Sequence, residues 1–361
     1  MKLRIDAILK TKTPLHIAAP GGARMDPSNG NIVYTGGIPC TTIQKLPIQD
    51  GDVIYNYPAI AANNIAGRLR RHAAKIVLDV LKNKGQKVSL HAYSVLQCGA
   101  ATGNPDAADI TYEEWKKATA HPYIGLFGGG NKMLRRKARV HNALPIIQPV
   151  LNLIGDLAHP AAETHALPLK SYLTKAWSFR RNDDLRELVN ISVAADVVDH
   201  FEEEFEKRQI SIVTEQLNKK AGESSELKSS TKTFSAIEFV IPGIPFGLLF
   251  ELDDVTPAQA GLFLLTLESF QKTEHLGGYV RNGFGAFSLN DVRLTNLESG
   301  EECNIFDGGA LVRPSVSNLL DSWFHEAEKL SAKEIEEIVS VTVKEKKKKE
   351  KTEKEPAHSP A

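Results

Sequence analysis

The chain has 361 residues, of which 42% are hydrophobic and 24% are charged, a composition typical of a globular protein with one large domain or two ordinary ones. No apolar run approaches the ~18 residues that a membrane span needs, and the first strand-like segment is too charged for a signal peptide. The three cysteines lie far apart and show no CxxC metal signature. We therefore expect a cytoplasmic protein with no membrane partner, no cofactor and no bound metal.

The net charge of zero conceals a segregation of charge along the chain. Residues 60–140 contain 14 Lys and Arg against 5 Asp and Glu, a surplus of nine positive charges. An acidic block at residues 199–206 compensates for part of it. A neutral chain can therefore carry a strongly positive face, which is what an anionic polymer partner requires.

The first third of the chain predicts a strand, a loop and a helix. Residues 3–17 alternate apolar and polar side chains, which is typical of a half-buried strand. Residues 20–31 are rich in Gly, Pro, Ser and Asn, so we expect a loop there. Residues 64–84 place their apolar side chains on one face and predict an amphipathic helix.

The middle of the chain reads as an insertion, and regular structure resumes after it. Residues 142–235 have mixed polarity, an acidic helix and a low-complexity run at 219–226 that we expect to be a mobile loop. The segments that follow predict two strands, a helix that begins at Thr256-Pro257 with Gln259 closing a capping box, a glycine-rich loop and a last core strand. In order, they are residues 237–241, 246–252, 256–270, 276–285 and 286–294.

This order of elements predicts an α+β fold. The sequence runs strand, helix, strands with a large insertion, helix and strand, which is the ferredoxin-like or RRM-like βαββαβ pattern. We place the domains as a ferredoxin-like core at 1–141 and 236–296, a helical and hairpin insertion at 142–235, a C-terminal helical extension at 297–340 and a disordered Lys/Glu-rich tail at 341–361.

The glycine-rich loop at residues 276–285 is the most informative stretch of the chain. Its sequence is Leu-Gly-Gly-Tyr-Val-Arg-Asn-Gly-Phe-Gly. Four glycines permit positive φ and let another polymer approach the backbone closely. Tyr279 offers a stacking face and Arg281 a cation for phosphate. A plain tight turn is the alternative interpretation.

Three basic segments accompany this loop, and we expect them to converge with it on one groove that grips an RNA backbone. On the predicted first helix, Arg68, Arg71 and Lys75 share a face, with Arg70 beside them; the alternative is a merely solvated face. A second basic block contains few acids, so a solubilising patch is the weaker explanation. Its candidate RNA-binding residues are Lys132, Arg135, Arg136 and Arg139.

The third basic segment, residues 170–181, interleaves cations with aromatic side chains. Base stacking contributes ~1–3 kcal/mol per base without reading sequence, and an apolar wedge flanked by cations suits the splaying of nucleotides. The alternative is that these rings are buried in a small core of the insertion itself. The candidate RNA-binding residues are Lys170, Tyr172, Lys175, Arg180 and Arg181.

Four motifs in the same order carry a resemblance to a known family. They are Thr13-Pro14-Leu15-His16-Ile17, the proline-to-Gly-Arg-Leu-Arg segment at 57–70, Leu126-Phe127-Gly128 before the basic block, and the Gly-Gly…Arg-Asn-Gly-Phe-Gly loop at 277–285. With them the chain resembles the CRISPR-associated RAMP superfamily, and within it the backbone subunit that coats guide RNA. An insertion near 34–56 and the segment 170–181 resemble the type IV backbone subunit more than its type III neighbour.

The resemblance implies a fold, a function and partners. Guide RNA (crRNA) would lie along a palm formed by the ferredoxin-like core, and a hairpin thumb from each copy would splay one nucleotide at regular intervals. The implied partners are crRNA, a complementary target strand (DNA for type IV), further copies of the chain in a helical filament, other effector subunits and, in some systems, a helicase. We expect a non-enzymatic subunit that presents the guide for pairing.

The alternative function is a metal-dependent endoribonuclease. In type III relatives an aspartate in the loop after the first strand is linked to cleavage of target RNA, and Asp26 occupies a similar place. One carboxylate is a thin metal site, however, and aspartate before proline commonly starts a turn. A guide-processing enzyme using His16 and a general RNA chaperone are further alternatives. We expect His121 and His141 to be structural or RNA-contacting rather than metal ligands.

Overall fold

The computed structural model describes residues 1–20, 23–26, 28, 31–33, 37–99, 110–130, 132, 134–168, 173–182, 195–207 and 232–340. The predicted mobile run at 219–226 and the predicted tail at 341–361 lie outside the described residues.

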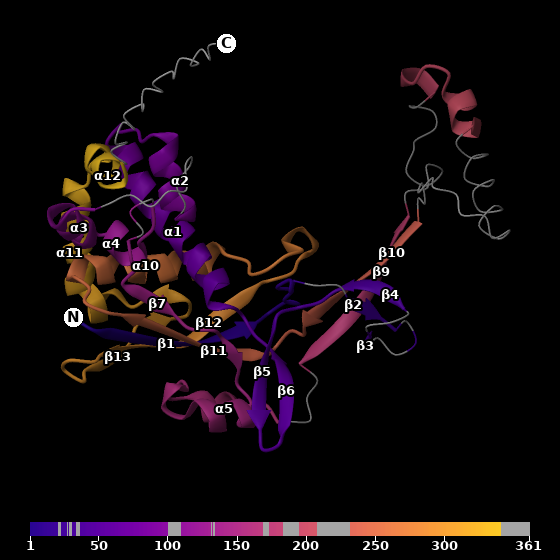
Figure 1. Ribbon diagram of the computed structural model, residues 1–361, viewed down its shortest axis with the longest axis horizontal. Helices are drawn as coiled ribbons and strands as arrows, with labels where there is room; N and C mark the ends of the chain where they lie inside the picture. The colour runs from indigo at the N-terminus through magenta and orange to yellow at the C-terminus, as the bar shows by residue number, and fades with distance from the viewer. Residues whose placement is uncertain are drawn as a thin grey trace, which may run out of the picture.

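The centre of the molecule is an antiparallel sheet with ferredoxin-like order (Figure 1). Its strands are β13 (Glu302–Asn304), β12 (Phe287–Asn296), β1 (Leu3–Thr11), β11 (Pro245–Leu252) and β7 (Ala138–Val140), in that spatial order, with β8 (Leu144–Pro145) also on β11. β1 pairs antiparallel with both β11 and β12, and β11 pairs antiparallel with β7. Counting β1, β7, β11 and β12 as first to fourth gives the order 4-1-3-2, which confirms the predicted α+β class and βαββαβ core. The second core strand is β7, however, and the predicted strand at 237–241 does not belong to this sheet.

Two helices cover one face of this sheet because the alternating apolar side chains of the strands point toward them. They are α1 (Ala62–Asn83) and α10 (Pro257–Thr273). Ile5, Phe250 and Leu289, from three adjacent strands, are buried in the same core as residues of both helices. The predicted start of α10 is confirmed, since Thr256 and Gln259 form a reciprocal capping box.

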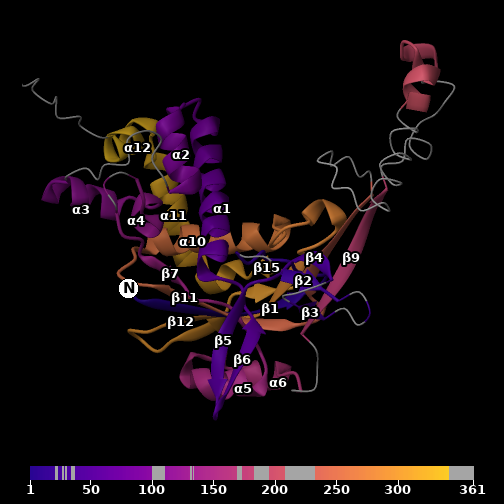
Figure 2. The same cartoon turned by 45° about the vertical axis from the view of Figure 1, so that its right-hand side comes forward.

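A helical lobe stands on this layer. It contains the outer part of α1 with α2 (Leu90–Cys98), α3 (Tyr112–Ala120), α4 (Ile124–Phe127), α11 (Ser317–Lys329) and α12 (Ala332–Val339) (Figures 1 and 2). Gly261 of α10 lets α11 approach closely, because a Cβ at this position would lie 2.2 Å from the carbonyl oxygen of Leu319. The lobe is therefore packed against the core rather than loosely attached.

The opposite face of the sheet is covered by a shorter segment. It comprises α5 (Gln148–Ile154), the 3₁₀ turn η1 (Gly155–Leu157) and α6 (Ala162–His165). Ile8 of β1 points to this side and packs with Ile146 and Ala162. None of the helices in the described part of the chain is long and apolar enough to cross a membrane.

A second sheet extends the molecule beyond the end of β1. Its order is β3 (Ile32–Val33), β2 (Ala23–Met25), β4 (Ile38–Thr41), β10 (Lys232–Val240) and β9 (Thr174–Asn182). The antiparallel ladder of β9 and β10 projects away from the core (Figures 1 and 2). Residues 23–25 therefore form a strand where the composition predicted only loop, because β2 finds a partner in β4.

The remaining short elements lie around these two sheets. A separate hairpin of β5 (Lys45–Asp50) and β6 (Val53–Pro58) precedes α1. The other elements are the small pair β14 (Phe306–Asp307) and β15 (Ala310–Leu311), and the 3₁₀ turns η2 (Val280–Asn282) and η3 (Arg313–Val316).

Candidate nucleic-acid interface

The glycine-rich loop packs directly on the segment that follows β1. The amide of Gly278 donates to the carbonyl oxygen of His16 at 2.8 Å. Gly277 has φ +79°, and a Cβ there would lie 2.1 Å from that same oxygen. Gly285, at φ +87°, approaches the carbonyl oxygen of Leu276 as closely. Glycine is thus required at both positions for conformation and for space.

Tyr279 is the side chain that this packing presents. Its backbone is left-handed at φ 58°, which is uncommon for a residue with a side chain, and its side chain is 40% exposed. The edge of the His16 ring meets the Tyr279 ring at a centroid distance of 5.1 Å. Buried His16 is itself fixed, since its Nδ1–H donates to the carbonyl oxygen of Glu238 at 2.6 Å. Tyr279 is therefore held in a strained conformation by the elements around it.

Two aromatic side chains of β9 lie beside the glycine-rich loop, and one of them contacts Tyr279. The rings of Phe179 and Tyr279 are nearly parallel, with centroids 6.4 Å apart and planes at 18°. Trp177 follows the same face of the strand, packs edge-on against Phe239 at 4.8 Å and against Phe284 at 6.2 Å, and remains 51% exposed. We name Trp177, Phe179 and Tyr279 the aromatic shelf. These rings rest on β10 and the glycine-rich loop, not in a separate core of the insertion.

Arg68 supports the shelf from the side of α1. Its guanidinium donates to Glu274 at 2.5 Å and to the carbonyl oxygens of His275 and Gly277 at 2.7 and 3.1 Å. Burial alone would raise the pKa of Glu274, but the hydrogen bond from His72 and the charge of Arg68 lower it to about 2. Arg68 is therefore engaged in holding the start of the glycine-rich loop, and its predicted contact with RNA has to share the guanidinium with that task.

Arg71 and Lys75 lie on the same face of α1 as Arg68, farther along the helix. They lie three and seven residues after Arg68, so the three side chains point to the same side of α1. Both are exposed, as is Arg281 in the loop, and none of the three forms an ion pair within the described residues. Exposed cations that form no ion pair are available for phosphate groups.

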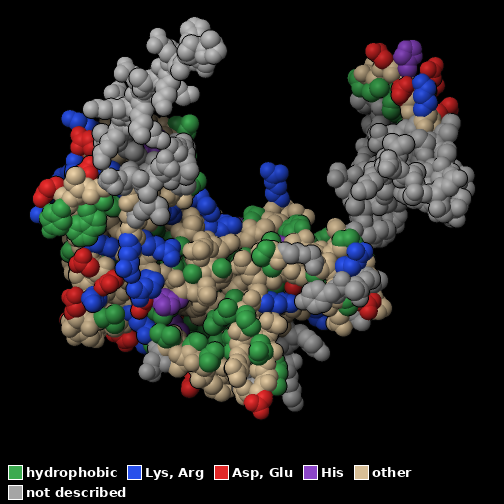
Figure 3. All heavy atoms as spheres, viewed as in Figure 1, with side chains coloured by type: hydrophobic (Ala, Val, Ile, Leu, Met, Phe, Trp, Pro, Cys, Tyr) green, Lys and Arg blue, Asp and Glu red, His purple; other side chains and the backbone are tan. Residues whose placement is uncertain are grey.

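These parts surround one hollow, which we call the groove. Its walls are the Arg71 and Lys75 face of α1 and the base of β9, and its floor is the glycine-rich loop. The space-filling view shows Lys and Arg side chains in the hollow between the helical lobe and the projecting ladder (Figure 3). Of the residues predicted from the sequence, the structure brings together Arg71, Lys75, Lys175, Tyr279 and Arg281, with Arg68 beneath them.

The second basic block does not join this groove. β7 and the start of β1 at Leu3 pair with the same end of β11. The glycine-rich loop lies at the other end of β1, and the length of that strand separates the two ends by roughly 25 Å. Lys132 pairs with Glu114 at 3.3 Å, and Arg139 pairs with Glu251 at 2.8 Å. The described structure therefore does not bring this block into the groove, and whether its side chains contact RNA stays a prediction.

Arg70 belongs with that block and not with Arg68. Two residues along a helix are rotated by about 200°, so Arg70 points away from the groove. Its guanidinium donates to the carbonyl oxygen of Gly128 at 2.9 Å and to that of Phe127, and lies over the Phe127 ring. Arg70, Phe127 and Arg136 line one small pocket. Burial, together with the charge of Arg70, lowers the pKa of Arg136. Arg135 is exposed nearby in sequence.

The remaining predicted residues are only partly placed. Lys170 and Tyr172 lie outside the described residues. Arg180 and Arg181 lie on β9, where they pair with residues 234 and 233 of β10. Whether these four side chains contact RNA stays a prediction.

Asp26 forms a local turn. Its Oδ1 accepts hydrogen bonds from the amide and the hydroxyl of Ser28 at 2.9 and 2.7 Å. Across the described ranges, no group of three His, Cys, Asp or Glu side chains could hold a metal ion. This geometry agrees with the turn-forming interpretation of Asp26. Likewise His141 contacts Glu251 at 2.9 Å, a pairing that ties it to β11.

His121 is buried at the end of α3, and its ring contacts the start of α4. Its Nδ1 accepts from the amides of Tyr123 and Ile124, so the proton sits on Nε2, which has no partner in the described structure. Burial lowers the pKa of His121 to about 4. A charged imidazole cannot accept these two hydrogen bonds, so the folded structure requires the neutral form of His121.

We expect acid to destabilise the protein through His121. The unfolded ring titrates near 6.5, so stability is complete above that pH and is lost as pH falls toward the folded value of about 4. The loss amounts to about 2 kcal/mol between pH 7.5 and pH 5. Urea unfolding at both values measures it. The His121→Gln variant should show a smaller difference between the two pH values, and an equal difference would contradict this role.

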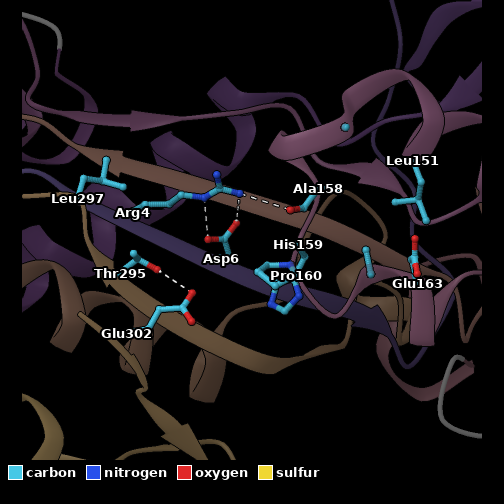
Figure 4. Close-up of a pocket in the computed structure, with 12 residues that line it drawn as sticks. Arg4, Asp6, Leu151, Ala158, His159, Pro160, Glu163, Thr295, Leu297 and Glu302 are labelled. Carbon is cyan, nitrogen blue, oxygen red and sulfur yellow. Dashed lines mark hydrogen bonds and ion pairs between the residues drawn. The ribbon is translucent and has the colours of Figure 1, made fainter. Parts of the chain in front are cut away.

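A sizeable cavity on the other face of the sheet is acidic. It has a volume of about 570 Å³ and is lined by Arg4 together with three carboxylates, from Asp6, Glu163 and Glu302 (Figure 4). Arg4 is already paired with Asp6 at 2.8 Å. A pocket with this balance repels phosphate, so nucleic acid belongs on the groove face instead.

Sequence reasoning missed how the site is supported. His16 was considered only as a catalytic alternative, yet it is the buried ring behind Tyr279. Trp177 and Phe179 are among the aromatic side chains that suggested base stacking at residues 170–181, but their place beside the glycine-rich loop was not predicted. Their spacing of two residues places them on one face of a strand, which is the signal that could have identified them.

Comparisons with known proteins give a matching family and a similar solved structure. The family model described as the RAMP superfamily matches residues 8–288. A solved structure titled "Type IV-B CRISPR Complex" is similar with 19% sequence identity and a TM-score of 0.48, covering 87% of this chain and 96% of that chain. Among curated proteins, none matches the chain.

Proposed function

The chain belongs to the RAMP superfamily, and from that premise we propose that it is a guide-RNA-binding backbone subunit of a type IV CRISPR effector complex. Copies of the subunit stack along one guide and present its bases to a complementary strand. The observation that carries this proposal is the aromatic shelf, exposed beside unpaired cations on one side of the ferredoxin-like core.

The groove suits a single strand without regard to its sequence. Exposed rings stack on any base, and Arg71, Lys75 and Arg281 supply charge for the backbone. The described side chains of the groove offer few groups for base edges, so the protein holds the strand while pairing with the guide sets specificity, as in other RNA-guided systems. The other partners are the target strand, proposed to be DNA, further effector subunits and, in some systems, a helicase.

We propose further that the subunit is not an enzyme. The turn geometry of Asp26 supports this, since its carboxylate is used within its own loop. Magnesium-dependent cutting of a complementary RNA by the purified chain, lost in Asp26→Ala, would contradict it and favour the endoribonuclease.

The nucleic acid that copurifies with the expressed chain tests the proposed function. Co-expression with a repeat-spacer array should yield discrete RNAs that share one repeat-derived end. Recovery of heterogeneous cellular RNA, with no enrichment of the guide, would contradict the proposal and indicate a general RNA chaperone.

Removing two wall cations should weaken RNA binding and its salt dependence together. In Arg71→Gln with Lys75→Gln, we expect the slope of log affinity against log salt to fall by about 1.4, because each phosphate contact on a single strand contributes ~0.7. Fluorescence anisotropy at KCl concentrations from about 50 to 300 mM, where counterion release dominates the affinity, measures this slope.

The matched control replaces Lys82 and Lys87, which are exposed beyond this stretch of α1, by Gln. It removes the same charge from the chain but not from the groove. An equal drop in the slope for both pairs would assign the effect to net charge and contradict the wall.

A further inference from the structure

The β5–β6 hairpin projects from the core (Figure 2), and exposed apolar side chains lie near its tip. Gly51 at φ +59° opens a two-residue turn, so the register is fixed as Gln49 opposite Ile54 and Ile48 opposite Tyr55. A two-stranded hairpin is marginally stable alone in water. The packing of its base therefore supports this hairpin, and its exposed apolar tip is a candidate contact surface.

The two faces of the hairpin have different surroundings. Ile48 is buried against Ile147 and Val150 beside α5, so its face is anchored to the core. Ile54 lies on the opposite face and is 66% exposed. Nothing in the described part of the chain covers it, and its own α5 lies on the wrong side to do so.

An apolar pocket lies at the base of the same hairpin. It has a volume of about 210 Å³ and no Asp or Glu among its lining residues. Leu46 of β5 forms one wall, Val150 and Ile154 of α5 form another, and Leu157 stands at the rim, 54% exposed. An apolar cavity of about 150 Å³ holds a benzene ring, so this pocket has room for an aliphatic side chain.

We propose that the tip of one copy, led by Ile54, docks into the α5 pocket of the next copy; this rests on the proposed filament. The same hairpin bears the tip at its end and a pocket wall at its base. The distance between the two is therefore the same in every copy, and successive copies would be spaced equally. Such a head-to-tail contact is heterologous and builds an open chain rather than a closed dimer. The neighbouring acidic cavity is the poorer acceptor, because Asp52 lies beside Ile54 in the tip.

Assembly on RNA tests the docking. In Ile54→Asp, association between neighbouring copies should weaken at least about tenfold, because a charge replaces a buried aliphatic group. Mass photometry on an RNA that holds several copies measures assembly, and anisotropy on an RNA that holds one copy measures binding. The number of copies assembled on the long RNA should fall, whereas the affinity of a single copy for the short RNA should stay within about twofold. Leu157→Asp should behave in the same way.

The matched control is Asn56→Asp, which adds the same charge two residues closer to the base on the outer face of the hairpin. It should assemble as the unaltered chain does. Assembly of Ile54→Asp at the unaltered level would overturn the proposal, as would an equal loss in the control.

A disulfide experiment without RNA separates the docking from the proposed function. Chains carrying Ile54→Cys and chains carrying Leu157→Cys, in a Cys98→Ser and Cys303→Ser background, are mixed and oxidised. Disulfides between the two kinds of chain support the docking even if guide binding fails. Their absence, or bonds only between two Ile54→Cys copies, would overturn it and, in the second case, indicate a tip-to-tip dimer.

Discussion

Replacing Trp177 and Tyr279 together by Ala should lower the affinity for single-stranded RNA at least about tenfold, and about a hundredfold if each ring stacks on its own base. The physical reason is that both rings are about half exposed on one shelf, and their truncation removes stacking without removing charge. The slope of log affinity against log salt should therefore stay unchanged. This combination distinguishes the shelf from the cationic wall.

A control for this variant exists on the helical lobe. Tyr112 and Trp115 of α3 form a stacked pair of similar exposure, with ring centroids 5.9 Å apart, away from the groove. Their replacement by Ala should leave RNA affinity unchanged. Anisotropy with one labelled RNA compares the two double variants, and an equal loss in both would remove the shelf from the binding site.

Gly277→Ala, like Gly285→Ala, should be among the most damaging single substitutions in the glycine-rich loop. The left-handed conformation costs about 1–2 kcal/mol for a residue with a Cβ, and the clash with the carbonyl oxygen of His16 adds about 1–3 kcal/mol. We expect a total loss of roughly 2–5 kcal/mol of unfolding free energy, or a displaced loop. Either result should also weaken RNA binding, because Tyr279 loses its support.

Gly283→Ala provides the matched comparison. Gly283 has φ +82°, but a Cβ there meets no atom within 4 Å. This variant should lose only the conformational part, about 1–2 kcal/mol, and retain RNA binding. Urea unfolding of both variants measures the difference, and equal stabilities would show that the close approach of Gly277 to His16 carries no energy.

The fold could be predicted from the sequence because local and global signals agree. The alternation in β1 and β11, the capping box at Thr256 and the amphipathic α1 each specify one element, and their order leaves the ferredoxin-like arrangement as the natural way to bury all of them. The strand β2 escaped prediction, since its pairing with β4 depends on a partner that is itself a short strand.

The site was harder to predict, because charge patterns in sequence do not reveal internal partners. Arg68 and Arg70 look equivalent in the motif, yet one holds the glycine-rich loop and the other holds the backbone of Phe127 and Gly128. Lys132 and Arg139 are similarly engaged with carboxylates. Exposed Arg71 and Lys75 share their helix face with Arg68, and only the three-dimensional structure separates a supporting cation from an available one.

The same distinction explains why a triple substitution of Arg68, Arg70 and Arg71 would be a poor test of RNA binding. Two of the three side chains hold parts of the fold together, so the variant would lose structure as well as affinity. Arg71 and Lys75 isolate the electrostatic contribution instead.

Photo-cross-linking tests the central claim most directly. A guide RNA carrying 4-thiouridine at each position in turn is bound to the purified chain, irradiated and digested, and adducts are located by mass spectrometry. The groove predicts adducts on Trp177, Phe179 and Tyr279. Adducts confined to Tyr112 and Trp115 of α3, or to peptides around β7, with none on the shelf, would show that RNA follows another face and would contradict the account.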